Sequence, residues 1–186
     1  LGWSQLLRTG TTTADDAAQG LETIERSARA QAQLIDDLLD MSRIISGKVR
    51  LDVRLVDLGD IAEAALDTVA AAAAARGIRL EKDFEPGLPR VRADPHRMQQ
   101  VLWNLLSNAI KFTGNGGSVC MLLRHVGPNL EVSVRDTGQG IAPEVLPFIF
   151  DRFRQGDGSA TRSHGGLGLG LAIAKHIVER HGGSIR

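Results

Sequence analysis

The chain has 186 residues, with 22 lysines and arginines balanced by 22 aspartates and glutamates. Because the net charge is zero, the composition argues against a nucleic-acid-binding surface and against a polybasic membrane anchor. The single cysteine, Cys120, excludes an internal disulfide and is typical of a reducing compartment; we expect it to be a small core residue. With no apolar run of membrane-spanning length and no signal peptide, we expect a cytoplasmic chain, attached to a membrane only through other parts of a longer parent.

Residues 1–46 predict a helical hairpin. A helix end comes first and is interrupted at Thr9–Thr13. Asp15 or Asp16 is then the expected N-cap of a long helix that runs to about Ile45. Apolar residues recur in this helix at spacings of three and four, which gives it a wide apolar face. A hairpin cannot bury such a face alone, so we expect a homodimeric four-helix bundle; packing on the following domain is the alternative.

Residues 47–186 alternate between strand and helix patterns, and we expect them to form one α/β domain. Aspartates and a proline mark the expected helix starts, and glycines mark the ends. The expected elements are a strand at 49–55, a helix from Asp57 to about Gly77, strands at 78–84 and 91–93, a helix from Asp94-Pro95 to about Phe112, a strand pair at 118–126 and 130–135, a short helix at 143–153, a last helix ending at His181, and the start of a strand at 184–186.

Three polar residues, Asn104, Asn108 and Lys111, follow one another along an edge of the predicted helix that ends near Phe112. Asparagine is a poor residue in the middle of a helix, because its side chain competes for backbone hydrogen bonds. Two asparagines one turn apart beside an apolar stripe therefore indicate either a polar site or a solvated face.

A second pattern, Asp136-Thr-Gly138-Gln-Gly140, follows the second strand of the predicted pair. Aspartate at this place favours a simple turn. Its carboxylate could also accept a hydrogen bond from the amino group of a base, with the glycines leaving room for the ligand.

A third pattern places glycines at 165, 166, 168 and 170 directly before a helical segment. The first amides of a helix lack partners within the helix and lie at the positive end of its dipole. A glycine-rich approach to such an end is typical of an anion site, although a mobile surface loop is the simpler alternative.

Together with the aromatic pair Phe150 and Phe153, these patterns stand in one order along the chain. They resemble the N, G1, F and G2 boxes of the sensor histidine kinases of two-component systems. The boxes are Asn104–Phe112, Asp136–Gly140, Phe150–Phe153 and Gly166–Leu171. The stretch after the F box, 154–164, is polar and rich in glycine and serine, and it is a candidate lid.

The resemblance implies an α+β protein: a partial dimerisation and phosphotransfer hairpin at 1–46, then a catalytic ATP-binding domain of the Bergerat type at 47–186. It implies ATP and Mg²⁺ as ligands, with Asn108 holding the metal and Asn104 and Lys111 as catalytic residues beside the phosphates. The other residues that it implies for ATP binding are Phe112, Asp136, Gly138, Gly140, Ile141, Gly166, Leu167, Gly168, Leu169 and Gly170. Ile110 would add an apolar contact near the adenine.

One position departs from the related ATP-hydrolysing families, which carry a glutamate base where this chain has Asn104. An amide cannot take a proton, so we expect phosphoryl transfer to a protein side chain and little hydrolysis. Arg152, Arg154 and Arg162 are candidates to offset charge on the γ-phosphate.

The phosphoacceptor histidine of the family has no counterpart in the hairpin, since the five histidines begin at His96. We expect that histidine upstream of Leu1, and we expect both ends of the chain to be truncated. The implied function is an ATP-dependent protein-histidine kinase core that serves a response-regulator receiver domain. An ATP-binding scaffold without phosphotransfer and a hydrolytic ATPase of the same superfamily remain alternatives.

Overall fold

The computed structural model describes residues 2–10, 12–46, 50–154 and 167–186. The chain divides into two compact units, residues 1–47 and 48–186, and each is described by itself. Among the described residues, none of the helices combines the length and apolar character needed to cross a membrane.

The first unit consists of α1 (Gly2–Thr9) and the long helix α2 (Ala14–Ile45). The expected N-cap at Asp15 or Asp16 is wrong: Thr13 caps α2, and its Oγ1 accepts the amide of Asp16 at 3.1 Å. The two aspartates instead lie in the first turn, where negative charge stabilises the positive end of the helix dipole. Several large apolar side chains of α2 are exposed, and the homodimer built on them remains a prediction; they include Leu21, Ile35, Leu38, Leu39 and Ile45.

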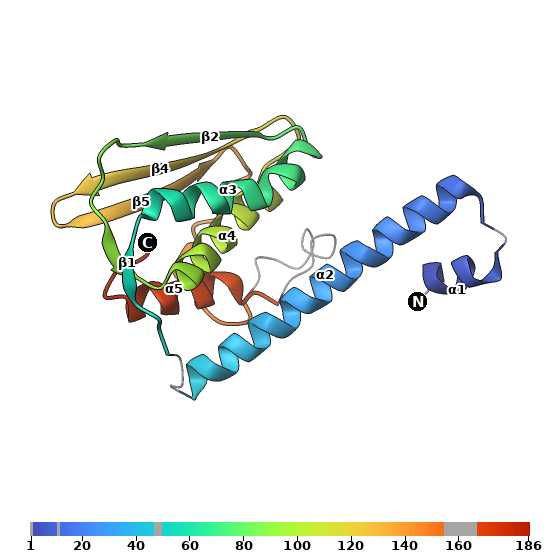
Figure 1. Ribbon diagram of the computed structural model, residues 1–186, viewed down its shortest axis with the longest axis horizontal. Helices are drawn as coiled ribbons and strands as arrows, with labels where there is room; N and C mark the ends of the chain where they lie inside the picture. Colours follow the sequence, from blue (N-terminus) through green and yellow to red (C-terminus); the bar gives the residue numbers. More distant parts are fainter. Residues whose placement is uncertain (1, 11, 47–49, 155–166) are drawn as a thin grey trace. The chain divides into compact units, whose positions relative to one another are not determined.

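The second unit is built on a mixed three-stranded sheet in the order β2-β4-β5 (Figure 1). β2 (Arg79–Phe84) runs parallel to β4 (Ser118–Val126), and β5 (Asn129–Asp136) returns antiparallel to β4. A separate pair joins β1 (Arg54–Val56) to β3 (Val91–Ala93) in antiparallel register.

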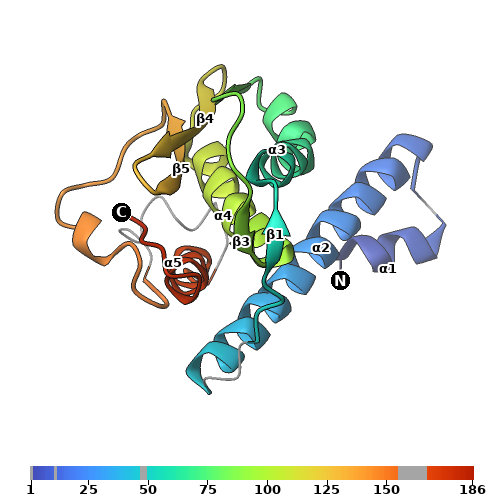
Figure 2. The same cartoon turned by 60° about the vertical axis from the view of Figure 1, so that its left-hand side comes forward.

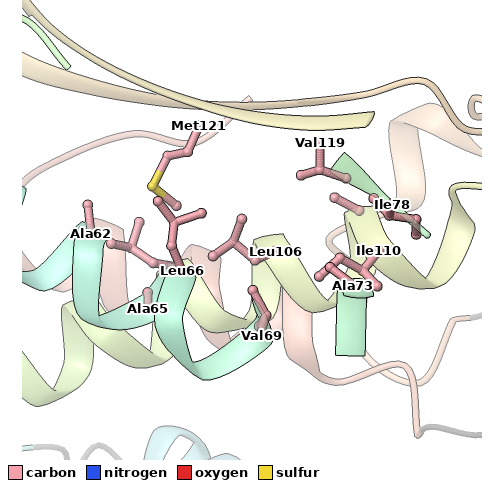
Figure 3. Packing of buried hydrophobic residues seen from close by; sticks show 12 residues of the cluster. Ala62, Ala65, Leu66, Val69, Ala73, Ile78, Leu106, Ile110, Val119 and Met121 are labelled. Atoms are coloured by element: carbon pink, nitrogen blue, oxygen red, sulfur yellow. The ribbon is translucent and has the colours of Figure 1, made fainter. Parts of the chain in front are cut away.

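Three helices complete this unit: α3 (Leu58–Ala74), α4 (Pro95–Phe112) and α5 (Gly170–Arg180). Asp57 and Asp94 cap α3 and α4, as the sequence predicts. The apolar faces of α3 and α4 pack against the inner side of the sheet, as the close view in Figure 3 shows. α4 lies between α3 and α5, so it is the central helix of the domain (Figure 2). The α+β class is confirmed, and the core cluster is Ala62, Ala65, Leu66, Val69, Ala73, Ile78, Leu102, Leu106, Ala109, Ile110, Val119 and Met121.

Two elements differ from the expectation. The strand predicted at 49–55 is limited to β1, because its partner β3 is itself only three residues long, and Leu55 remains 62% exposed. The helix predicted at 143–153 is reduced to the 3-10 turn η1 (Leu146–Phe148). Pro147 lies inside this turn, and a proline cannot donate the amide hydrogen bond that an α-helix needs.

Two smaller expectations are also wrong. Along β4 the alternate residues Val119, Met121 and Leu123 are 0% exposed on the core side. Cys120 therefore faces the other side of the sheet, where it is half-buried rather than in the core. Residues 184–186 form no strand.

Candidate functional site

The first contact of the site joins the middle of α4 to the start of α5. Asn104 is only 4% exposed, and its Nδ2 donates to the main-chain oxygen of Gly170 at 3.0 Å. A Cβ at position 170 would lie 3.1 Å from Oδ1 of Asn104, so the amide packs closely on the first turn of α5. The solvated-face alternative is thus wrong for Asn104.

Asn108 and Lys111 lie one and two turns further along the same edge of α4 and are half-buried. Burial lowers the pKa of the Lys111 ammonium below its ordinary value, because desolvation disfavours the charged form. The Nζ atom of Lys111 lies 4.9 Å from the centroid of the Phe112 ring. The helix therefore presents an amide and an ammonium in succession, both partly shielded from water.

The turn Asp136–Gly140 packs on the C-terminal end of α4. Oδ1 of Asp136 accepts the amide of Gly138 at 2.8 Å, and the amide of Gln139 donates to the carbonyl of Phe112 at 3.3 Å. A Cβ at position 138 would lie 2.5 Å from that same carbonyl oxygen, so only glycine fits there. We call this segment the Asp136 turn. The aspartate forms a turn, as one of the two interpretations predicts, and the residue is exposed; its role as acceptor from a base stays a prediction.

Apolar groups flank the Asp136 turn. Phe112 is 39% exposed and Ile141 is 52% exposed, so both could contact a ligand. Ile110 is only 5% exposed and belongs to the core cluster, and its expected contact with adenine stays a prediction. Gly140 has φ +71°, and a Cβ there would meet open space.

The described part of the glycine-rich segment contacts the end of the aromatic motif. Gly168 has φ +67°, and a Cβ there would lie 2.5 Å from the carbonyl oxygen of Arg154. The amide of Phe153 donates to the carbonyl of Gly168 at 3.2 Å, and Phe153 itself has φ +60°. Phe153 is a non-glycine residue in the left-handed region, where backbone strain often accompanies functional sites.

α5 begins directly after this contact. Leu169 occupies its N-cap position and makes no side-chain capping hydrogen bond. Leu169 is 1% exposed and holds the segment on the core, while Leu167 is half-buried. Gly166 and the lid candidates from 155 onwards, Arg162 among them, lie outside the described residues. The start of α5 thus retains amides suited to an anion.

Phe150 of the F box and the nearby Phe148 each have a cationic side chain over the ring. The Nζ of Lys175 on α5 lies 5.6 Å from the Phe150 ring centroid, and the Arg154 guanidinium carbon lies 4.0 Å from that of Phe148. Desolvation, together with the positive charges of Arg180 and Arg152, lowers the pKa of His176, while Glu179 opposes this shift. The charge of Arg152 thus acts on His176 of α5.

Two residues of the domain carry contacts that no local pattern indicated. The Arg76 guanidinium donates to main-chain carbonyls at the C-terminal end of α4. Nε2 of His181 accepts the amide of Asp94 at 3.0 Å, and its Nδ1 contacts the carbonyl of Ile177 at 2.8 Å. The contacts of Arg76 with α4 and of His181 with Asp94 join segments more than thirty residues apart, so spacing along the chain could not have predicted them.

No group of three or more histidine, cysteine, aspartate or glutamate side chains within the described ranges could hold a metal ion. A metal ion at this site would therefore be held by oxygen atoms of a ligand and of water beside a protein amide. That donor set would suit Mg²⁺, which keeps several waters and binds phosphate oxygens; Asn108 as the source of the amide oxygen stays a prediction.

Taken pairwise, the contacts join all four sequence motifs. Asn104 reaches Gly170, Phe112 reaches the Asp136 turn, and Phe153 reaches Gly168. α4 contacts both the turn and the start of α5, so a polar helix edge, a carboxylate turn and a helix N-terminus lie around one part of the domain.

Known proteins with similar sequences belong to one family. Residues 93–186 match the family described as "Histidine kinase-, DNA gyrase B-, and HSP90-like ATPase". The chain is 40% identical over 172 residues to hybrid signal transduction histidine kinase D of Dictyostelium discoideum, covering 89% of this chain and 11% of that protein. It is 40% identical over 168 residues to the circadian input-output histidine kinase CikA of Synechococcus elongatus, covering 89% of this chain and 22% of that protein.

Among solved structures, the chain is similar to one described as full-length ShkA in complex with AMPPNP. The TM-score is 0.74 at 29% identity, over 96% of this chain and 37% of that one. The chain thus spans about a tenth to a fifth of the two curated relatives. These relatives are histidine kinases, which are enzymes of the transferase class. The chain belongs to the histidine kinase-, DNA gyrase B- and HSP90-like ATPase family, and its second unit is a catalytic domain of the sensor histidine kinase type.

Proposed function

We propose that this chain is the core of an ATP-dependent protein-histidine kinase of a two-component system. In this proposal it transfers the γ-phosphate of ATP to a histidine outside residues 1–186, from which the phosphate passes to an aspartate of a response-regulator receiver domain. The single observation that carries the proposal is the hydrogen bond between Asn104 and Gly170. It joins the asparagine-edged helix to the helix N-terminus, and these two elements are the ones that a triphosphate would bridge.

Each motif has a distinct role in the proposed site. The Asp136 carboxylate accepts a hydrogen bond from the amino group of adenine, and Gly138 keeps the turn against the carbonyl of Phe112 without a side chain in the way. Amides at the start of α5 and the Lys111 ammonium bind phosphate oxygens. Asn108 would hold Mg²⁺, which neutralises charge on the phosphates when bound. The AMPPNP complex of the related ShkA structure is consistent with this nucleotide.

The hydrogen bonding and chemistry of the Asn104 amide favour transfer of the γ-phosphate to a protein over hydrolysis of ATP. Its Nδ2 is a donor to Gly170, and an amide has no basic site that could activate a water molecule. The transferred group then needs positioning and charge neutralisation more than a base, and Arg152, whose charge acts on His176 of α5, is the candidate for that role among the described residues. Steady release of inorganic phosphate without an acceptor protein would contradict this proposal and favour the ATPase.

The proposed assembly is a homodimer through the hairpin. Its support is the row of exposed apolar residues on α2, such as Leu21, Ile35 and Leu38, which a second hairpin would cover. In this proposal residues 1–46 are part of the dimerisation and phosphotransfer hairpin, and residues 47–186 are the catalytic ATP-binding domain. The kinase core acts in the cytoplasm.

Calorimetric titration of the chain with Mg-AMPPNP tests the nucleotide site. Asn108→Asp adds a negative charge beside the phosphates, and Gly168→Ala adds a Cβ 2.5 Å from the Arg154 carbonyl oxygen; each should lower affinity by more than about tenfold. Asn115→Asp and Gly127→Ala are the matched controls, because Asn115 is exposed and Gly127 has open space at φ +59°. Unchanged binding in both site variants would end the proposal.

Phosphotransfer needs a second assay. A protein that joins this chain to a phosphoacceptor histidine of the family should incorporate labelled γ-phosphate in an acid-labile form, as expected of phosphohistidine. A purified receiver domain should then remove the label. Nucleotide binding without any incorporation would favour the scaffold without phosphotransfer.

A further inference from the structure

The C-terminal end of α4 carries carbonyl groups that the helix itself does not use. A helix leaves its last carbonyls without intrahelical donors, and these oxygens also form the negative end of the helix dipole. In α4, Thr113 donates its amide to Ala109 at 3.0 Å and closes the helix there. The carbonyls of Ile110, Lys111 and Phe112 follow and need donors from elsewhere.

Arg76, from another part of the chain, donates to two of these carbonyls, those of Ile110 and Lys111. Its Nη1 donates to the carbonyls of Ile110 and Lys111, the latter at 3.1 Å, and its Nη2 donates to the carbonyl of Thr113 at 2.9 Å. A guanidinium is planar and permanently charged, so it can satisfy several carbonyls in a fixed geometry while its charge complements the dipole.

The third carbonyl is satisfied by the site itself. Phe112 accepts the amide of Gln139 from the Asp136 turn at 3.3 Å. The two donors therefore share one helix end: Arg76 holds it from the side of α3, and the Asp136 turn is seated on it from the side of β5. Any movement of this end shifts the surface on which the turn rests.

Arg76 is well placed to hold that position, because its own backbone is fixed. It lies in the turn after α3, and its carbonyl accepts the amide of Gly116 at 3.3 Å. Two residues after Gly77, the amide of Arg79 donates to the carbonyl of Gly117 at 2.9 Å. The turn after α3 and the turn after α4 are thus joined by main-chain and side-chain hydrogen bonds together.

We propose that Arg76 is a positioning residue of the nucleotide site: by capping the last carbonyls of α4 it sets the place of Phe112 and of the Asp136 turn that reads the base. The inference rests on the proposed nucleotide site, and it adds a residue that contacts neither phosphate nor base. Loss of the cap should weaken nucleotide binding through displacement of the turn, while the fold persists.

A matched control separates this role from general support of the fold. Arg124 also donates to main-chain carbonyls, those of Asp83 and Leu123, and it pairs with the Asp83 carboxylate. It lies on β4 opposite Glu131, five residues along the ladder from the pair Val119 and Asp136, so it is remote from the Asp136 turn. Arg124→Met removes the same kind of contacts without touching α4.

The experiment compares wild-type, Arg76→Met, Arg76→Lys and Arg124→Met chains by calorimetric titration with Mg-AMPPNP. Arg76→Met should weaken binding by about tenfold, and Arg124→Met should leave it within about twofold. Arg76→Lys keeps the charge and part of the donor set, so its affinity should fall between wild type and Arg76→Met. Hydrogen exchange of the peptide covering 136–141 should be faster in Arg76→Met than in Arg124→Met.

The outcomes are distinct. Wild-type affinity in Arg76→Met, or equal losses in Arg76→Met and Arg124→Met, would overturn the positioning role while leaving the nucleotide site in place. Absence of Mg-AMPPNP binding in the wild type would overturn the proposed function itself. If circular dichroism finds Arg76→Met unfolded, Arg76→Lys is compared with Arg124→Lys, and equal affinities of these two would contradict the inference.

Discussion

The two ends of α4 are capped by different means. At its N-terminal end, Asp94 accepts the amides of His96 and Arg97, both at 3.1 Å, and these donors are two and three residues away in the sequence. At its C-terminal end, the donors are Arg76 and Gln139, which lie more than twenty-five residues away in either direction. One end is thus a local structure, and the other exists only in the folded domain.

The difference corresponds to what each end does. The N-terminal end is a junction within the fold: Asp94 is 6% exposed, its Oδ2 accepts the amide of Asp52 at 2.9 Å, and its own amide donates to His181. The C-terminal end supports the Asp136 turn. We therefore expect changes at the first end to alter stability at nearly constant nucleotide affinity, and changes at the second to alter affinity first.

The largest effect is expected for Gly138→Ala at the C-terminal end. The added Cβ would lie 2.5 Å from the Phe112 carbonyl, so the turn must move, and Mg-AMPPNP affinity should fall by about a hundredfold in calorimetric titration. Gly114→Ala is the control near the same helix end, since a Cβ there meets nothing within 4 Å. Similar affinities in the two variants would remove the functional distinction between the ends.

At the N-terminal end, Asp94→Ala should lower the free energy of unfolding by about 2 kcal/mol, because it removes a buried N-cap. Mg-AMPPNP affinity of the folded variant should stay within about twofold of wild type. Denaturant unfolding and titration measure the two quantities. Asp57→Ala, which removes the N-cap bond of α3 to Gly59, is the control for the loss of a simpler cap. A large loss of affinity in Asp94→Ala would break the comparison.

The Asp94 carboxylate should also make the free energy of unfolding depend on pH. Burial alone would raise the pKa of Asp94, but hydrogen bonds from the amides of Asp52, Arg97 and His96, with the charge of Arg97, hold that pKa below its ordinary 3.8. The folded state then binds the proton less readily than the unfolded chain. The stabilisation is present above pH 3.8 and is lost as the pH falls through the lower, folded-state pKa. Asp94→Asn should flatten this part of the stability profile.

A smaller loss is expected for His181→Leu, which removes the acceptor of the Asp94 amide. A buried amide without its partner should lower the free energy of unfolding by about 1.5 kcal/mol, again at nearly constant affinity. His125→Leu is a suitable control because His125 is exposed on β4. Equal stability of the two variants would show that the His181 contact contributes nothing to this junction.

The smallest effect concerns Lys111 near the C-terminal end. Because burial lowers the pKa of its ammonium below 10.5, the charge that binds phosphate should be lost earlier on raising the pH than for an exposed lysine. Mg-AMPPNP affinity should therefore decline on raising the pH before an exposed lysine would lose its charge, and Lys111→Arg should abolish that decline. Between the folded and unfolded pKa values, the contribution of Lys111 to stability rises with pH, opposite to affinity. A flat wild-type affinity profile would contradict this role.

The sequence predicted the elements well where signals were local. The bounds of α4, the hairpin of β4 and β5, and the caps Asp57 and Asp94 were all found from caps, turns and alternation. The prediction failed where a neighbouring strand limited the length of a strand, or where a single residue interrupted a helix. β1 is short because β3 is short, and Pro147 reduces the expected helix at 143–153 to a single turn.

The site was predicted as a set of motifs but not as a set of contacts. Asn104 was recognised as unusual for its place in a helix, yet its donor role toward Gly170 depends on the packing of α5 on α4. Arg76 follows a run of alanines and carries no motif, so its carbonyl partners on α4 could not be foreseen.

Residue order alone thus specified where helices and strands begin, because capping and alternation act over a few neighbouring residues. Packing of distant segments specified which groups meet: the amide of Asn104 with the start of α5, and Arg76 with the last turn of α4. Carbonyls at a helix end must find donors, and those donors can come from any segment that folding brings near. That is why the support of this site is visible only in three dimensions.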